Sequence, residues 1–276
     1  MNKHLLIYLI CIPQILWATE KNGQVIIDYI YANSFEYVIE RNDTGMTIDW
    51  AQESATMVPC SNSTTPQPDC SHGRDSGATG ANNGDGHVGF SFTKLDLNGQ
   101  ALPDNTALGA QNWHCNRDNV TGLVWERKIP FSTGIHGLGV AGDDTNQYRW
   151  GGITHVGSNY SSDSNPYYDD WDVIINASNT ENLCGFSDWR MPTRAELADI
   201  IDYSGPWTWN SNHGTIYIDP TIQFLDYREN TPIFWTATPS AQLENYAISI
   251  NFKTSEINHI NRNAKYNVIL VRGEKQ

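Results

Sequence analysis

The chain has 276 residues, with 31 Asp and Glu against 17 Lys and Arg, and its formal net charge is −14 at pH 7. A surface this acidic repels nucleic acid and sulfated or phosphate-bearing polymers unless a local basic patch reverses the field. Arg127-Lys128 is the densest basic pair before the C-terminal tail. We therefore expect no nucleic-acid partner.

Residues 1–18 are typical of a secretory signal. Lys3 and His4 form a short polar start, an apolar run follows at 5–17, and Ala18 suits the last position before cleavage. The run is too short to span a membrane, and no later segment approaches the required length. The sequence predicts a protein that is not integral to the membrane and is exported to the periplasm, the cell surface or the medium. A retained anchor helix is the alternative.

Cleavage would leave four cysteines, Cys60, Cys70, Cys115 and Cys184. An even number in an exported chain favours two disulfides, and three pairings are open. We favour Cys60–Cys70, which closes a short Pro- and Ser-rich loop, and Cys115–Cys184, which joins the start of the best-patterned region to its central helix. Neither a C-x-x-C motif nor a Cys/His cluster is present, which disfavours zinc and thiol-redox roles.

Residues 19–112 are predicted to form an N-terminal extension. Short runs rich in β-branched and aromatic residues at 25–31 and 35–39 favour strands. Residues 57–87 are mostly Ser, Thr, Asn, Asp, Gly and Pro, which indicates a long loop. A further strand is expected at 88–94.

The main domain is predicted at 113–273. It opens with an apolar strand at 121–127, followed by a polar loop at 132–166 and a helix at 167–178 with carboxylates near its start. Ca²⁺ prefers oxygen ligands, so the carboxylates of this region could bind it. In the alternative, these carboxylates only start a helix on a solvated surface and bind no ion. The candidate calcium ligands are Asp163, Asp169, Asp170 and Asp172.

A second helix is predicted at 194–203. Thr193 and Glu196 have the spacing of a capping box, in which each side chain bonds the backbone N–H of the other. Leu197, Ile200 and Ile201 then recur at helical spacing and must face a core. Gly205-Pro206 would end this helix.

The polar segment at 205–219 contains our candidates for ligand contact. Indole rings stack on the apolar faces of sugars, and amide or imidazole groups bond hydroxyls; the same mixture suits a protein interface. In the alternative, the tryptophans only pin the loop to the core. The candidates are Trp207, Trp209, Asn210, Asn212 and His213.

Three closing strands are predicted at 232–238, 246–252 and 267–272. The second alternates apolar and small polar residues, the pattern of a half-buried strand. No Gly-x-Ser-x-Gly elbow, His-Glu-x-x-His motif or phosphate-binding glycine loop occurs, so we expect no enzyme.

Arg190 and Arg272 lie within apolar segments. A buried guanidinium needs a carboxylate or carbonyl partner, and Asp188, Glu196 and Asp199 are the candidates. This favours a structural role over ligand binding for both arginines.

Four motifs occur in order: Thr-Gly-Leu-Val-Trp at 121–125, Leu-Cys-Gly-Phe-Ser-Asp-Trp-Arg-Met-Pro-Thr-Arg-Ala-Glu-Leu at 183–197, Phe-Trp-Thr-Ala-Thr at 234–238, and Val-Arg at 271–272. Together they resemble the Lcl C-terminal domain family, a domain of unknown function in exported bacterial proteins. The resemblance covers about 115–273. The residues of these motifs to which we assign structural roles are Trp125, Trp189, Arg190, Thr193, Glu196, Trp235 and Arg272.

The resemblance implies an α+β, C-type-lectin-like fold, with two helices packed on a small twisted, mainly antiparallel sheet and long loops. It also implies an exported, non-enzymatic binding or adhesion module that recognises carbohydrate or a surface protein through those loops. The alternative is a structural or assembly component of the bacterial envelope or pilus without a small ligand. A metal-dependent or oxidative enzyme is a third reading, but the oxidase branch of the superfold needs a late cysteine pair and no cysteine follows Cys184.

Overall fold

The computed structural model divides into two compact units, Met1–Glu40 and Arg41–Gln276. The residues that it describes are 5–6, 17–21, 24–28, 41–46, 48–51, 56–59, 62, 89–107, 110, 112–128, 147–151, 171–203, 207–208, 215–219, 221–222 and 232–273.

The first unit contains a three-stranded antiparallel sheet, in the order β1-β2-β3. Its strands are β1 (Leu5–Leu6), β2 (Trp17–Lys21) and β3 (Gln24–Asp28). The strand predicted at 25–31 is present in part as β3. The strand predicted at 35–39 lies outside the described residues.

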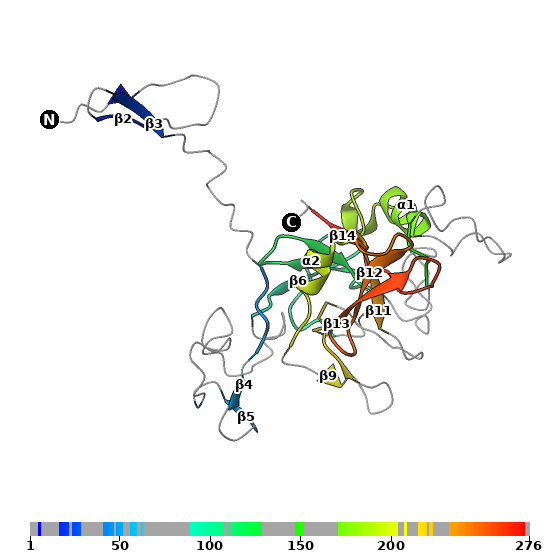
Figure 1. Cartoon of the computed structure of the whole chain (residues 1–276). Helices are drawn as coiled ribbons and strands as arrows, with labels where there is room; N and C mark the ends of the chain where they lie inside the picture. The colour runs from blue at the N-terminus through cyan, green and yellow to red at the C-terminus, as the bar shows by residue number, and fades with distance from the viewer. Residues whose placement is uncertain are drawn as a thin grey trace. The chain divides into compact units, whose positions relative to one another are not determined.

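The second unit contains two larger antiparallel sheets, one with the order β14-β8-β7-β6 and one with the order β11-β12-β13. Figure 1 labels β6 and β14 of the first sheet and all three strands of the second. Two short hairpins, β4-β5 and β9-β10, accompany them. The elements are β4 (Ile48–Ala51), β5 (Thr56–Pro59), β6 (Phe92–Leu95), β7 (Cys115–Asp118), β8 (Val124–Glu126), α1 (Asp172–Thr180), a 3₁₀ turn (Leu183–Gly185), α2 (Arg194–Ala198), β9 (Trp207–Thr208), β10 (Thr215–Ile216), β11 (Ile233–Pro239), β12 (Tyr246–Asn251), β13 (Glu256–Asn261) and β14 (Val271–Arg272).

The C-terminal segment joins the two sheets. Near its start, the Trp235 N–H of β11 donates to the Asn267 carbonyl at 3.0 Å. Three residues later, the Glu126 N–H of β8 donates to the Leu270 carbonyl at 2.9 Å. Residues 267–272 were predicted as one strand, but only the last two residues of this segment form a strand, β14. The segment instead contacts a different sheet at each end.

The buried apolar side chains form two clusters, and β6, β8, β11 and β12 each contribute residues to both. Along the C-terminal segment the side chains alternate, with Val268 and Leu270 in one cluster and Ile269 and Val271 in the other. Core 1 comprises Leu95, Cys115, Val124, Tyr148, Trp150, Trp171, Ile174, Leu183, Cys184, Trp189, Met191, Trp235, Ala247, Val268 and Leu270. Core 2 comprises Phe90, Phe92, Leu123, Trp125, Leu197, Ile200, Ile201, Ile218, Ile222, Phe234, Ile250, Phe252, Ile269 and Val271.

Burial on both faces corrects the prediction for β12. The alternating pattern predicted one exposed face, yet Ala247 and Ser249 are as fully buried as Ile250. Ala247 contributes to core 1, while Ile250 on the opposite face contributes to core 2. The small side chains of Ala247 and Ser249 therefore reflect close packing on their face of β12 and not contact with water.

Each described helix covers a different core. Trp171 and Ile174 place α1 on core 1, and Leu197 places α2 on core 2. The helix predicted at 167–178 is present as α1 from Asp172 onward; residues 167–170 lie outside the described part of the chain. The α2 helix also lies against β11 and β12 (Figure 1).

The prediction of a helix at 194–203 is wrong in its length, because α2 ends at Ala198. Ile201 instead forms an antiparallel bridge with Ile218, and the Asp202 N–H donates to the Tyr217 carbonyl at 3.1 Å. Leu197, Ile200 and Ile201 are nevertheless all buried in core 2. The apolar stripe was interpreted correctly as core, but pairing with a distant segment ends the helix early.

In the two larger sheets, two strands were missed and two were predicted slightly out of place. The short strands β4, β5, β9 and β10 were not predicted either, and β5 lies at the start of the loop expected at 57–87. The missed strands, β7 and β13, consist largely of polar residues, and much of β13 is exposed. The strand predicted at 88–94 is observed as β6, which covers Phe92–Leu95. The strand predicted at 121–127 is shorter, because residues before Val124 form a turn and only β8 is a strand. Because β6 pairs with β7, one sheet spans the boundary expected at 112/113.

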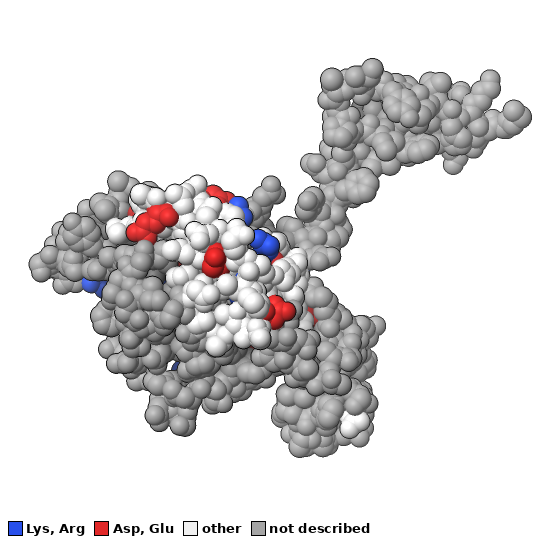
Figure 2. All heavy atoms as spheres, turned by 180° about the vertical axis from the view of Figure 1, so that it is seen from behind, with Lys and Arg blue, Asp and Glu red and all other residues white. Residues whose placement is uncertain are grey.

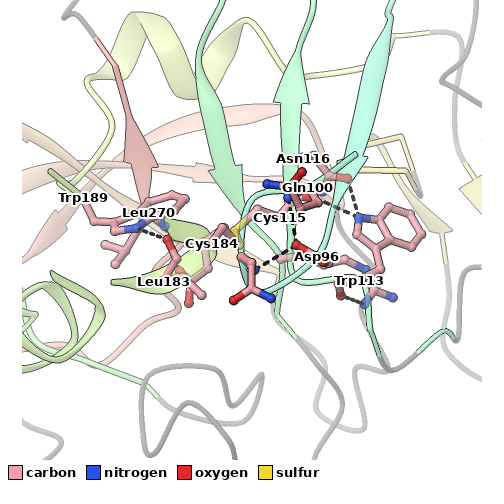
Figure 3. Close-up of a disulfide and its surroundings, with 12 residues drawn as sticks. Asp96, Gln100, Trp113, Cys115, Asn116, Leu183, Cys184, Trp189 and Leu270 are labelled. Atoms are coloured by element: carbon pink, nitrogen blue, oxygen red, sulfur yellow. Dashed lines mark hydrogen bonds between the residues drawn. A yellow bond between two sulfur atoms is a disulfide. The ribbon is translucent and has the colours of Figure 1, made fainter. Parts of the chain in front are cut away.

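The Cys115–Cys184 disulfide joins β7 to the 3₁₀ turn across 69 positions of sequence, as predicted (Figure 3). Both cysteines are fully buried in core 1. Cys60 and Cys70 lie outside the described residues.

Replacing Gly99 with Ala is expected to lower the free energy of unfolding by more than the same change at Gly122. Both glycines have left-handed φ angles, +77° and +74°, which cost a residue with a Cβ about 1–2 kcal/mol. At Gly99 a Cβ would also lie 2.5 Å from the Cys184 carbonyl oxygen, whereas nothing lies within 4 Å of one at Gly122. Denaturant titration of the two variants measures the difference; equal losses would contradict the close approach.

Candidate functional site

The longest motif folds around a buried ion pair at the start of α2. Arg190 Nη2 donates to Glu196 Oε1 at 2.7 Å, and Arg190 Nη1 donates to Glu196 Oε2 at 2.9 Å. The Glu196 side chain is fully buried, while that of Arg190 is 18 % exposed. The Thr193 N–H donates to Glu196 Oε2 at 2.7 Å, and the Glu196 N–H donates to Thr193 Oγ1 at 3.2 Å. The predicted capping box is confirmed, and its carboxylate also neutralises Arg190.

A second ion pair lies nearby on the surface. Arg272 Nε and Nη2 each donate to a carboxylate oxygen of Asp188 at 2.9 Å. These hydrogen bonds hold the pKa of Asp188 below its ordinary value. The Arg272 guanidinium also lies 4.3 Å from the centre of the Phe186 ring. Both arginines therefore contact carboxylates that the sequence named as candidate partners.

The motif tryptophans are part of the scaffold. Trp189 lies in core 1, where its Nε1–H donates to the Leu183 carbonyl at 3.0 Å. Trp235 also lies in core 1, and Trp125 lies in core 2. All three rings are at most 2 % exposed. None of the three therefore offers an exposed face.

The third candidate partner, Asp199, contacts a different arginine. Arg41 Nη1 donates to Asp199 Oδ1 at 3.1 Å. In the next residue, Asn42 Nδ2 donates to Asp118 Oδ2. Burial raises the pKa of Asp199, and the nearby charges of Asp118 and Glu196 raise it further against the opposing effect of Arg41.

Replacing Asp199 with Asn is expected to raise the melting temperature at neutral pH. A raised pKa in the folded state means that protonation stabilises the fold at low pH, and this stabilisation is lost as the pH rises through the folded pKa. Asn does not titrate, and the Arg41 side chain is 55 % exposed, so its ion pair contributes little. In thermal unfolding, the difference in melting temperature between Asp199→Asn and wild type should shrink as the pH falls toward about 4. A lower melting temperature for Asp199→Asn at pH 7 would contradict this.

A cation–aromatic cluster beside β7 was not predicted from the sequence. Lys94 Nζ lies 4.8 Å and Arg127 Cζ 4.2 Å from the centre of the buried Trp113 ring. Burial lowers the pKa of Arg127 to about 10, so this residue remains charged at neutral pH. Lys128 Nζ pairs with Glu126 at 2.7 Å, and burial raises the pKa of that carboxyl. The run Glu-Arg-Lys directly after an apolar strand was the available signal.

The candidate ligand loop begins and ends at a described hairpin. Trp207 pairs with Ile216, and Thr208 pairs with Thr215. Directly after β10, the Tyr217 N–H donates to the Phe252 carbonyl at 2.6 Å, which attaches this end of the loop to the end of β12. The side chain of Trp207 and the candidates Trp209, Asn210, Asn212 and His213 lie outside the described residues.

Only one of the four calcium candidates lies in the described part of the chain. Asp172 is the first residue of α1, where a carboxylate suits the helix dipole. Asp163, Asp169 and Asp170 lie outside the described residues. Within the described part of the chain, no three or more His, Cys, Asp or Glu side chains form a group that could hold a metal ion.

The described surface on the face drawn in Figure 2 is mostly neutral, and its acidic side chains lie apart from one another.

Among the helices that the structure describes, none has both the length and the apolar character needed to cross a membrane.

The fold and its motif residues define an α+β domain in which two ion pairs and three buried tryptophans maintain the scaffold. The chain belongs to the Lcl C-terminal domain family, whose model matches residues 114–272, more than half of its length. No curated protein and no solved structure matches it.

Proposed function

We propose that this protein is an exported, non-enzymatic binding or adhesion module that recognises carbohydrate or a surface protein through its long loops. Export rests on the signal-like residues 1–18, and the buried Cys115–Cys184 disulfide is consistent with an oxidising compartment. We also propose that the scaffold is C-type-lectin-like, on the resemblance of its motifs and the mixed α+β architecture.

The observation that carries the proposal is that the charged residues of the motifs pair with one another within the scaffold. Arg190 is bound by Glu196, and Arg272 is bound by Asp188. Because these groups satisfy one another, the most family-specific sequence supports the fold, and recognition is left to the segments between the elements. The loop at 207–213 is the favoured segment because it combines two tryptophans with Asn and His.

A glycan array with wild type and a Trp207→Ala/Trp209→Ala variant tests the proposal. The expected result is binding of wild type to at least one glycan class, with loss of that binding in the double variant and an unchanged melting temperature. Tyr203→Ala is the matched control, since Tyr203 is an aromatic residue with 43 % exposure just outside the loop. No binding by wild type to any glycan would favour the alternative, an envelope or pilus assembly component.

Calcium remains a separate proposal for the aspartates at 163, 169, 170 and 172. The array is therefore repeated with calcium chloride and with a chelator. Binding that persists unchanged in chelator, together with an unchanged melting temperature, would remove calcium from the proposed function.

A further inference from the structure

The backbone around Cys184 has an uncommon conformation. Asn182, Cys184 and Gly185 have φ angles of 52°, 51° and 76°, all in the left-handed region. Glycine adopts this region freely, but a residue with a Cβ is disfavoured there by contact with its own carbonyl. Cys184 therefore needs surrounding interactions to keep this conformation.

Two backbone hydrogen bonds close the turn around Cys184, from the Gly185 N–H to the Asn182 carbonyl at 2.7 Å and from the Phe186 N–H to the Leu183 carbonyl at 3.1 Å. The disulfide and the turn at 96–100 supply the further interactions. Cys184 is bonded to Cys115 of β7 (Figure 3). Its carbonyl oxygen lies against Gly99. The turn is itself rigid, because Asp96 Oδ1 accepts the N–H groups of both Asn98 and Gln100 at 2.8 Å. The disulfide is the covalent link that holds the left-handed segment against this turn.

The two ends of the segment are fixed without the disulfide. Asn179 of α1 pairs with the backbone of Trp189 in both directions, accepting its N–H at 2.6 Å and donating to its carbonyl at 3.0 Å. The Trp189 indole N–H also donates to the Leu183 carbonyl. Phe186 is also held, because its ring packs edge-on against Trp189 and lies under the Arg272 guanidinium. Opening the disulfide therefore removes the covalent tie on Cys184 and Gly185 while α1 stays attached to Trp189.

We propose that Cys184 and Gly185 form a redox-dependent latch, which is closed against the turn at 96–100 when Cys115 and Cys184 are bonded and open when they are reduced. A dithiol reductant supplies two electrons and two protons: the S–S bond breaks, two thiols form, and the reductant becomes a cyclic disulfide. Cys184 then relaxes to negative φ and its carbonyl moves away from Gly99. If export occurs as proposed above, the latch closes only after export; the latch itself does not depend on that function.

Hydrogen exchange on the full chain tests the latch, with mass spectrometry of peptides covering 96–100 and 182–186. Wild type is compared before and after reduction by dithiothreitol, and with Cys115→Ala/Cys184→Ala and Cys115→Ala/Cys184→Gly variants. Reduced wild type and the Ala variant should exchange about 10-fold faster in both peptides, a ratio equivalent to about 1.4 kcal/mol. The Gly variant should recover most of the protection because glycine adopts the left-handed conformation without this cost.

The β12 peptide is the internal control, because this strand is buried on both faces and carries neither cysteine. Equal protection of oxidised wild type and the Ala variant would overturn the latch. Equally fast exchange of the Ala and Gly variants would show that backbone conformation at 184 is not its basis. Lost protection in β12 as well would mean global unfolding, which also overturns a local latch. None of these outcomes depends on glycan binding.

Discussion

Replacing Glu196 with Gln is expected to lower the free energy of unfolding by about 3–5 kcal/mol, because it leaves a largely buried guanidinium without its counter-charge. The Glu196 carboxylate accepts two hydrogen bonds from Arg190 and one from the Thr193 N–H. The amide of Gln can replace only part of this, since its NH₂ group would face the donors of Arg190. Denaturant-induced unfolding followed by tryptophan fluorescence measures the loss.

Asp188→Asn is the matched control for Glu196→Gln. It breaks an ion pair of the same bidentate geometry with Arg272, but the Asp188 side chain is 54 % exposed. Exposed pairs contribute about 1 kcal/mol or less, so this variant should remain close to wild type. Equal losses in the two variants would show that burial does not distinguish the pairs and would contradict the structural role given to Glu196.

Replacing Trp235 with Ala is expected to cost about 3–5 kcal/mol of unfolding free energy. The Trp235 ring is fully buried in core 1 and packs edge-on against Tyr266 with a centroid separation of 5.6 Å. Its Nε1–H donates to the Tyr148 carbonyl at 2.8 Å, but that carbonyl also accepts the Tyr266 N–H and so keeps a partner. The loss should therefore come mainly from the cavity.

Calorimetry on Trp235→Ala should show a lower melting temperature. A single transition is expected because β11 contributes side chains to both cores, so that the two cores should unfold together. Ile257→Ala, on β13 of the same sheet, is the control because Ile257 is 38 % exposed and should change stability little. A Trp235→Ala protein as stable as Ile257→Ala would contradict the placement of Trp235 at the centre of core 1.

Local features of the site were predictable because their partners lie close in sequence. Thr193 and Glu196 are three residues apart, so the capping box follows from spacing alone. Arg190 and Glu196 are six residues apart, and a buried arginine needs a carboxylate. The pairing of Cys115 with Cys184 spans 69 positions, yet the even cysteine count and the patterning on either side were sufficient to favour it.

Features that depend on distant strands were missed. The polar β13 is a strand because all six of its residues pair with β12, from Glu256 opposite Asn251 to Asn261 opposite Tyr246. The α2 helix ends at Ala198 because Ile201 pairs with Ile218, 17 positions farther along the chain. Neither partner can be inferred from local propensity, which tertiary pairing overrides.

By itself, the sequence determined the start of α2, the set of carboxylates from which the partners of Arg190 and Arg272 come, and the approximate positions of the apolar strands, because each depends on neighbouring residues or on side-chain type. Only the tertiary structure decided that the apolar residues divide into two cores, that the C-terminal segment joins both sheets, and that Cys184 is held in a left-handed conformation. These depend on which distant segments pack together, and a periodic pattern carries no information about its partner.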